Sequence, residues 1–335
     1  MKGYMRKLIC GTMLLCLLLA GCAEKSAPAE SGTSTDGQDK IVVRIGSNRA
    51  IGTVTPYLAK EMGYFDGKDY EVEVVDFSDG TTIMEAMAAG EVEMGLVGIV
   101  PVVTWSSKGF DVRVVASANG GGHVILSTEE RGIQTVADLK GKTMTVPNIG
   151  TVTDALLKAY ILPRFDMSVD DIVVIPGMKP VDMATAMATT DDLDAIMTWE
   201  PYASMAELEY DNIVVVYDAA VEYQKNNKSD AIYPTNVVAA SGEFCDEHPE
   251  IVKDILSEIE KTVEYTRNNI TDSDQKIAAV LGISQEAVNK ARERCILTFD
   301  VDVDATYEVL SWAQDLGYIA ELPAEDDLFD LKYIN

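Results

Sequence analysis

The residues best suited to binding chemistry lie in a pentapeptide that occurs twice, Ile-Gly-Thr-Val-Thr at 51–55 and again at 149–153. The decapeptides at 51–60 and 149–158 are identical at seven of ten positions. Each copy follows a short β-branched run and opens an amphipathic stretch, which predicts a strand, a glycine turn and the start of a helix. The first N–H groups of a helix are unpaired and carry partial positive charge. Two such turns facing one cleft would form a clamp for a small anion or zwitterion.

A second repeat keeps nearly the same offset. Ala86-Met87-Ala88 recurs as Ala186-Met187-Ala188, and each copy is followed by an acidic turn, a short apolar run and a proline. Two copies predict two similar βαβαβ half-domains and not a solenoid, which needs at least three repeats. The alternative, a chance similarity between β/α turns, stays open at this point.

From Lys40 onward the sequence alternates between strand and helix patterns, as in a mostly parallel sheet with helices on its faces. The predicted strands cover residues 41–45, 71–77, 93–97, 112–116, 123–127, 143–146, 172–175, 193–197, 213–216 and 235–241. The segments at 123–127 and 235–241 are the predicted crossovers between two lobes. We therefore expect lobe one to comprise residues 41–125 and 232–335, and lobe two to comprise residues 126–231.

Ligands of open α/β sheets bind beyond the carboxyl ends of the strands. The residues that follow the predicted strands, together with the repeated turns, are the candidate ligand-binding residues. They are Ser47, Asn48, Gly52, Thr53, Ile99, Val100, Gly122, His123, Asn148, Gly150, Thr151, Trp199 and Glu200.

Several of these residues also have a structural interpretation. Thr151 with Asp154 fits a helix capping box. Trp199 would either form a flat wall for an organic ligand or pack against the next helix. Glu200 would either bind a cationic group or lie beside a helix start, and His123 would be either a ligand contact or a buried structural histidine.

The N-terminus has the pattern of an export signal. Lys2, Arg6 and Lys7 precede an apolar run at 8–19 that is too short to span a bilayer. The run ends in Leu-Ala-Gly-Cys at Cys22, which looks like a bacterial lipobox. We expect residues 1–21 to be a signal peptide, Cys22 to carry lipid, and residues 22–40 to be a flexible tether. The protein would then be exported and lipid-anchored to the bacterial cell membrane, facing the periplasm or the cell exterior.

Composition limits the remaining possibilities. The 335 residues are enough for two domains, and the formal net charge of −28 argues against nucleic acid or an anionic bilayer as partner. Cys245 and Cys295 would remain in the mature chain, either as one disulfide or as two free thiols. With two histidines and no Cys-x-x-Cys, we expect no metal site and no cofactor.

Residues 45–65, 86–108, 133–158 and 193–203 resemble the substrate-binding proteins of ABC importers for nitrate, sulfonates and taurine. Further landmarks are Asp138-Leu139-Lys140-Gly141-Lys142, Trp199-Glu200-Pro201 and the segment from Phe244 to Glu250. The resemblance implies an α/β, two-lobed periplasmic-binding-protein fold of type II, with a mostly parallel, helix-flanked sheet in each lobe and the ligand in the interlobe cleft. It also implies delivery of the ligand to an ABC permease with a cytoplasmic ATPase. We expect the protein to be a monomer.

We therefore expect a solute-binding protein that is not an enzyme, with a sulfonate or taurine-like ligand. A pyrimidine or thiamine-precursor heterocycle stacked on Trp199 is the alternative ligand, and a surface sensor without transport is the alternative role. The related pyrimidine synthases use a cysteine-rich motif and an active-site histidine, and no such cysteine cluster occurs in this sequence.

Overall fold

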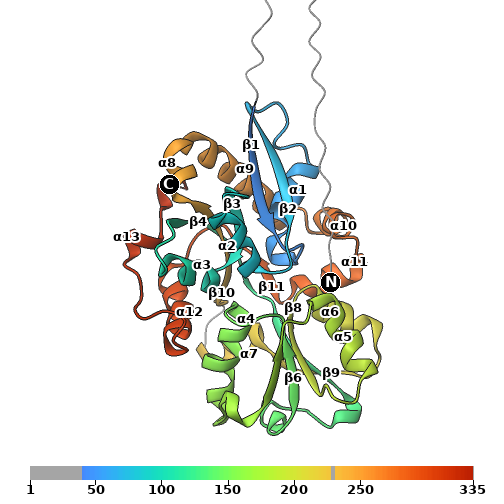
Figure 1. Ribbon diagram of the computed structural model, residues 1–335. Coiled ribbons are helices and arrows are strands. Elements are labelled where there is room, and N and C mark those ends of the chain that lie inside the picture. The colour runs from blue at the N-terminus through green and yellow to red at the C-terminus, as the bar shows by residue number, and fades with distance from the viewer. Residues whose placement is uncertain (1–39, 228–230, 335) are drawn as a thin grey trace, which may run out of the picture. The chain divides into compact units, whose positions relative to one another are not determined.

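The computed structural model describes residues 40–227 and 231–334. The predicted signal peptide, lipidation site and tether up to residue 39 lie outside the described residues. The described chain forms a two-lobed α/β structure with one sheet in each lobe, as Figure 1 shows.

The sheet of lobe one has the order β11-β4-β10-β3-β1-β2. Strand β1 pairs in parallel with β2 and β3, whereas β10 is antiparallel to both β3 and β4, and β11 is antiparallel to β4. Strands β1 to β4 therefore run one way, and β10 and β11 the other. The strands are β1 (Ile41–Ser47), β2 (Tyr70–Asp76), β3 (Met94–Gly98), β4 (Val112–Gly121), β10 (Pro234–Ser241) and β11 (Cys295–Leu297).

The sheet of lobe two has the order β7-β6-β8-β5-β9. Strand β6 pairs in parallel with β7 and β8, and β5 is antiparallel to β8 and β9. Only β5 runs against the other described strands of this sheet. The strands are β5 (His123–Thr128), β6 (Thr143–Val146), β7 (Val173–Pro176), β8 (Ala195–Trp199) and β9 (Ile213–Asp218).

The predicted crossovers at 123–127 and 235–241 are therefore strands β5 and β10, and each is inserted as an antiparallel strand in a different sheet. The predicted lobe boundary after residue 125 falls inside β5. The lobe boundaries themselves stay a prediction.

Helices cover both sheets. Lobe-one elements are α1 (Thr55–Glu61), α2 (Gly80–Ala88), α3 (Ile99–Ser106), α8 (Gly242–Glu247), α9 (Pro249–Asn268), α10 (Ile270–Leu281), α11 (Gln285–Arg292), α12 (Val303–Asp315) and α13 (Glu325–Leu328). Lobe two contributes α4 (Val152–Ala155), α5 (Pro180–Thr189), α6 (Tyr202–Glu209) and α7 (Ala219–Asn227). Helix α4 continues as a π-helical segment, Leu156–Ile161. No helix within the described ranges is both long and apolar enough to cross a bilayer.

Apolar periodicity explains these elements. All five residues of β3 are buried, as expected for a central strand covered on both faces. Along α9, Val252, Ile255, Ile259 and Val263 are buried at spacings of three and four residues, so one stripe of the helix faces the core.

The sequence prediction was wrong at two places near the cleft. Strand β4 extends to Gly121, although the prediction ended it at residue 116, because its small and polar end is paired with β10 and β11. Cys295, which lies outside all the strands predicted from sequence, begins β11. Both segments are strands because their backbones pair with strands that are distant in sequence. The local sequence pattern does not predict such pairing.

Candidate ligand-binding pocket

A pocket lies between the two sheets, with a cavity volume of about 50 Å³. That volume is enough for a few water molecules or a compact ligand. Its walls come from both lobes. They are formed by Asn48, Ala50, Gly52, Asp79, Gly80, Gly98, Pro101, Asn119, Gly121, Gly122, His123, Thr151, Val152, Thr153, Trp199, Glu200, Thr235, Asn236 and Cys295.

Both copies of the repeated pentapeptide reach this pocket. Gly52 of the first copy lines it, and so do Thr151 and Thr153 of the second. The local structures differ, because the first copy forms a 3-10 turn (Ile51–Thr53) before α1, whereas Thr151 is the N-cap of α4. The Thr151 hydroxyl accepts a hydrogen bond from the Asp154 backbone N–H at 3.3 Å, so the predicted capping interaction is present.

Seven of the thirteen predicted ligand-binding residues line the pocket: Asn48, Gly52, Gly122, His123, Thr151, Trp199 and Glu200. Ser47 and Thr53 are buried beneath it. The Thr53 hydroxyl donates to Asn48 Oδ1 at 2.7 Å, and the Ser47 hydroxyl donates to the Thr53 carbonyl at 3.0 Å. These two residues position Asn48.

The other four predicted residues also lie off the pocket walls. Ile99 and Val100 are the first two residues of α3, and their side chains are fully buried in the hydrophobic core. Asn148 and Gly150 shape the turn before α4, where the Asn148 carbonyl accepts the Thr151 hydroxyl at 2.9 Å and the Gly150 N–H donates to Asp154 at 3.1 Å. Gly150 has a φ of 76°, which favours glycine.

Several pocket residues were missed by the sequence prediction. Thr235 and Asn236 lie near the start of β10, and Cys295 starts β11. Both strands run antiparallel to their neighbours, so their amino ends meet the cleft and a search of carboxyl ends passes over them. Asp79 follows β2, and Thr153 lies within the second repeated turn. The sequence rules that gave the other candidates could therefore have found both residues.

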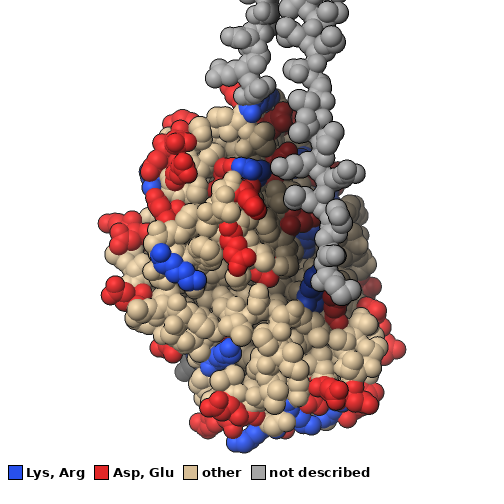
Figure 2. Space-filling view, in the orientation of Figure 1, with Lys and Arg blue, Asp and Glu red and all other residues tan. Residues whose placement is uncertain are grey.

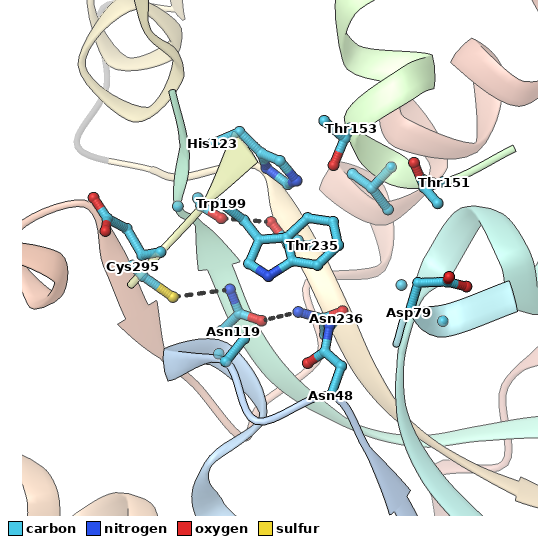
Figure 3. Close-up of a pocket in the computed structure, with 18 of the residues that line it drawn as sticks. Asn48, Asp79, Asn119, His123, Thr151, Thr153, Trp199, Thr235, Asn236 and Cys295 are labelled. Atoms are coloured by element: carbon cyan, nitrogen blue, oxygen red, sulfur yellow. Dashed lines mark hydrogen bonds between the residues drawn. The ribbon is translucent and has the colours of Figure 1, made fainter. Parts of the chain in front are cut away.

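Three pocket side chains, Asn236, Asn119 and Cys295, form a chain of hydrogen bonds across adjacent strands. The Asn236 amide donates to Asn119 Oδ1 at 2.6 Å, and the Asn119 amide donates to Cys295 Sγ at 3.2 Å. Figure 3 shows both bonds beneath the Trp199 ring. A Cβ added to Gly52 would lie 2.3 Å from Asn119 Oδ1, so only glycine fits against this amide.

Trp199 presents an unused hydrogen-bond donor in the pocket. Its indole Nε1 is buried and has no hydrogen-bond partner among the described residues. Figure 3 places its ring at the centre of the view, with Thr151, Thr153 and Asp79 to its right. A buried indole N–H without a partner favours a ligand atom that accepts a hydrogen bond.

His123 and Cys295 contribute no charge to the pocket near neutral pH. Burial lowers the pKa of His123 to about 3, and its Nδ1 lies 3.1 Å from the Tyr233 hydroxyl. Burial also raises the pKa of the Cys295 thiol. Cys245 and Cys295 are both buried free thiols, so the disulfide alternative is wrong.

Glu200 is buried and its carboxylate is already occupied. Arg294 Nη1 lies 3.1 Å from Glu200 Oε1, and the Ser204 N–H donates to Oε2 at 3.0 Å. Burial raises the pKa of Glu200, and Arg294 and the Ser204 N–H act against that rise. Glu200 also joins the two lobes through its backbone, because its carbonyl accepts the Ile51 N–H at 3.3 Å.

No group of three or more His, Cys, Asp or Glu residues within 40–227 and 231–334 is arranged to hold a metal ion.

Comparison with known proteins identifies the family. The model of the family described as NMT1/THI5 like matches residues 53–271. The chain belongs to this family. A putative aliphatic sulfonates-binding protein of Bacillus subtilis (strain 168) is 26% identical over 290 residues, covering 85% of this chain and 81% of that protein. The 4-amino-5-hydroxymethyl-2-methylpyrimidine phosphate synthase THI11 of Saccharomyces cerevisiae is 22% identical over 244 residues, covering 68% of this chain and 67% of that one.

Among solved structures, the periplasmic aliphatic sulphonate binding protein SsuA of Escherichia coli has a TM-score of 0.69 with 21% identity, and covers 84% of this chain and 94% of that one. The predicted two-lobed periplasmic-binding-protein fold is confirmed. Both of these sulfonate-binding relatives are binding proteins and not enzymes, which agrees with the predicted role.

Proposed function

We propose that this chain is the solute-binding protein of an ABC importer, which captures a small zwitterionic or anionic organic ligand and delivers it to a membrane permease. The observation that carries this proposal is the pocket between the two sheets, lined by both copies of the repeated turn. A binding protein of this kind closes its lobes around the ligand by a hinge motion.

A sulfonate or taurine-like molecule is the proposed ligand. The Trp199 indole N–H has no partner among the described residues, and the hydroxyl of Thr153 and the amide NH2 of Asn48 make no hydrogen bond within the same ranges. These neutral donors suit the oxygens of a sulfonate group. The small cavity favours a compact ligand, and a sulfonate-binding relative supports the class.

A pyrimidine or thiamine-precursor heterocycle is the second candidate. The aromatic ring of Trp199 lies in the pocket, where it would stack on a flat ligand. The yeast pyrimidine phosphate synthase among the relatives supports this alternative.

The cellular setting follows from the same proposal. The protein would be exported and held at the bacterial membrane by lipid on Cys22, as a monomer with an ABC permease and its cytoplasmic ATPase as partners. The lobes would be 41–125 with 232–335, and 126–231. Figure 2 shows Asp and Glu gathered at both ends of the visible face, with Lys and Arg scattered among them, which agrees with the net charge of −28. Genes for a permease and ATPase beside this one would support transport, whereas a neighbouring sensor kinase would favour a receptor that only signals.

A thermal-shift screen of the purified protein without its predicted signal peptide tests the proposal. The panel holds taurine, alkanesulfonates, nitrate, sulfate, bicarbonate, and pyrimidine and thiamine precursors. A ligand at a hundred times its Kd stabilises the folded state by about 2.7 kcal/mol. Stabilisation by a sulfonate supports the first candidate, and stabilisation by a heterocycle supports the second. A flat response to the whole panel would refute both ligand classes.

A further inference from the structure

The walls of the pocket carry negative and not positive side chains. Asp79 and Glu200 line it, and none of the described residues that line it is Lys or Arg. His123 is neutral near pH 7, since burial lowers its pKa to about 3, and burial raises the pKa of the Cys295 thiol. The remaining side-chain hydrogen-bonding groups are neutral amides, hydroxyls and the Trp199 indole.

The arginine that lies against this pocket is occupied by other groups. Arg294 pairs with Glu200 at 3.1 Å and with Asp218 at 2.8 Å, and it also pairs with Glu207. Lys290 adds one more cation, 3.0 Å from Glu207. Three carboxylates therefore share two cations, which leaves Arg294 without spare positive charge for an anionic ligand.

Asp79 has no such cation. Its side chain is mostly buried, with 7% of the residue exposed, and no ion pair involves it within the described ranges. Its Oδ1 accepts the backbone N–H groups of Thr81 at 2.8 Å and Thr82 at 3.1 Å, as the N-cap of α2. Its Oδ2 accepts a single hydrogen bond, from the Ser78 hydroxyl at 3.0 Å. A carboxylate oxygen can accept two, so Oδ2 keeps one free acceptor position.

The buried Asp79 carboxylate has no ion pair within the described ranges, and the described pocket wall has no cation. Both features disfavour an anionic ligand. A plain anion entering this cavity would lose its hydration and meet negative charge in a medium that screens weakly. A ligand with an ammonium or other N–H-bearing nitrogen would gain from the same charge.

We propose that this pocket selects ligands carrying a cationic or N–H-donating nitrogen, and that Asp79 discriminates against plain anions such as nitrate, sulfate and simple alkanesulfonates. The inference rests on the proposed function as a solute receptor and narrows its ligand class. The acidic end of a zwitterion would be bound by the neutral donors of Trp199, Asn48 and Thr153, and its nitrogen by Asp79.

Matched ligand pairs test this inference by isothermal titration of the mature protein. Taurine and ethanesulfonate share the sulfonate and differ by the amine, and 4-amino-2-methylpyrimidine and 2-methylpyrimidine differ by an amino group. We expect the member that carries the amino group to bind at least tenfold more tightly in one of the two pairs. In Asp79→Asn this preference should fall to threefold or less, while α2 stays capped because asparagine is also a strong N-cap residue.

Asp302→Asn is the matched control. Asp302 is the N-cap of α12, where its side chain accepts the Ala305 N–H at 2.9 Å, and it does not line the pocket. This variant should keep the wild-type ligand preference.

The outcomes distinguish a failure of this inference from a failure of the proposed sulfonate ligand. Equal binding within both ligand pairs by the wild type would overturn the inference, and binding of both taurine and ethanesulfonate would then leave the sulfonate receptor standing. Binding of the aminopyrimidine alone, with its preference lost in Asp79→Asn, would support the inference and refute the sulfonate class. Tight binding of nitrate or sulfate that Asp79→Asn does not strengthen would also overturn it. So would the absence of binding by both amino-bearing ligands, taurine and 4-amino-2-methylpyrimidine.

Discussion

Gly52 is the residue at which the first repeated turn meets the asparagine chain of the pocket. An alanine methyl there would overlap the Asn119 amide, which lies 2.3 Å from the position of the added carbon. We expect Gly52→Ala to displace Asn119 and, through it, the hydrogen bonds to Asn236 and Cys295. Ligand affinity measured by calorimetry should fall at least tenfold. Unchanged affinity would mean that these amides do not shape the pocket.

His123 provides a pH-dependent contribution to stability. Its pKa is lowered by burial to about 3 in the folded protein, from 6.5 in the unfolded chain. Between these values the unfolded state binds more protons, so the contribution of His123 to the unfolding free energy is present above pH 6.5 and is lost as the pH falls toward 3, by about 1 kcal/mol per pH unit.

The variant His123→Gln removes this titration. Urea unfolding of both proteins at several pH values should show the wild type losing stability more steeply than the variant below pH 6.5. Parallel curves would contradict the assignment. The same substitution at His248, which does not line the pocket, is the control.

At the residue scale, the sequence identified seven of the nineteen residues that line the pocket. Prediction succeeded where a residue follows a parallel strand, as for Asn48 and Trp199. It failed for Asn236 and Cys295, because only the assembled sheet shows that β10 and β11 run in the opposite direction. It also named Ile99 and Val100 for the site, although both side chains turn into the core.

At the scale of single elements, local chemistry made the prediction more reliable. Strand β6 occupies Thr143–Val146, the residues predicted from their β-branched run, and both glycine turns precede helices as expected. The start of α4 depends on the Thr151 hydroxyl, which both accepts the Asp154 N–H and donates to the Asn148 carbonyl.

Thr151→Val therefore tests capping and ligand binding together. The variant loses the cap, so we expect the unfolding free energy to fall by about 1 kcal/mol in urea denaturation. Ligand affinity should fall as well, because Thr151 lines the pocket. Thr151→Ser keeps the hydroxyl and should recover both quantities. A stability equal to wild type in Thr151→Val would contradict the capping role.

At the scale of the whole described chain, the two lobes are joined by charge as well as by connecting strands. Arg294 lies between α11 and β11, which belongs to the sheet of β1. Its partners Glu200 and Asp218 lie at the ends of β8 and β9 in the other sheet, and Glu207 lies on α6. The Arg294 side chain is 13% exposed. Sequence analysis gave no sign of this cluster, since its members are separated by up to 94 positions and come together only in the folded protein.

Arg294→Met should leave these carboxylates with one fewer cation in a largely buried site. Removing one partner of a buried ion pair costs about 3–5 kcal/mol of stability. Lys290→Met is the matched control, because Lys290 is more exposed and has a single ion pair, to Glu207, so its loss should cost about 1 kcal/mol or less. Equal losses for the two variants in urea denaturation would refute the assignment of Arg294 as the main ionic link between the lobes.

Strand β11 also determines when the pocket can form during synthesis. The walls extend from Asn48 near the start of the described chain to Cys295 close to its end. A growing polypeptide therefore lacks a complete pocket until Cys295 has been made, although the strands of lobe two could already pair. Contacts between such distant parts of a chain form late and slowly in folding. If the protein is exported as its N-terminus predicts, ligand capture begins only after Cys295 has crossed the membrane, so the chain cannot carry a bound solute across the membrane as it leaves the cell.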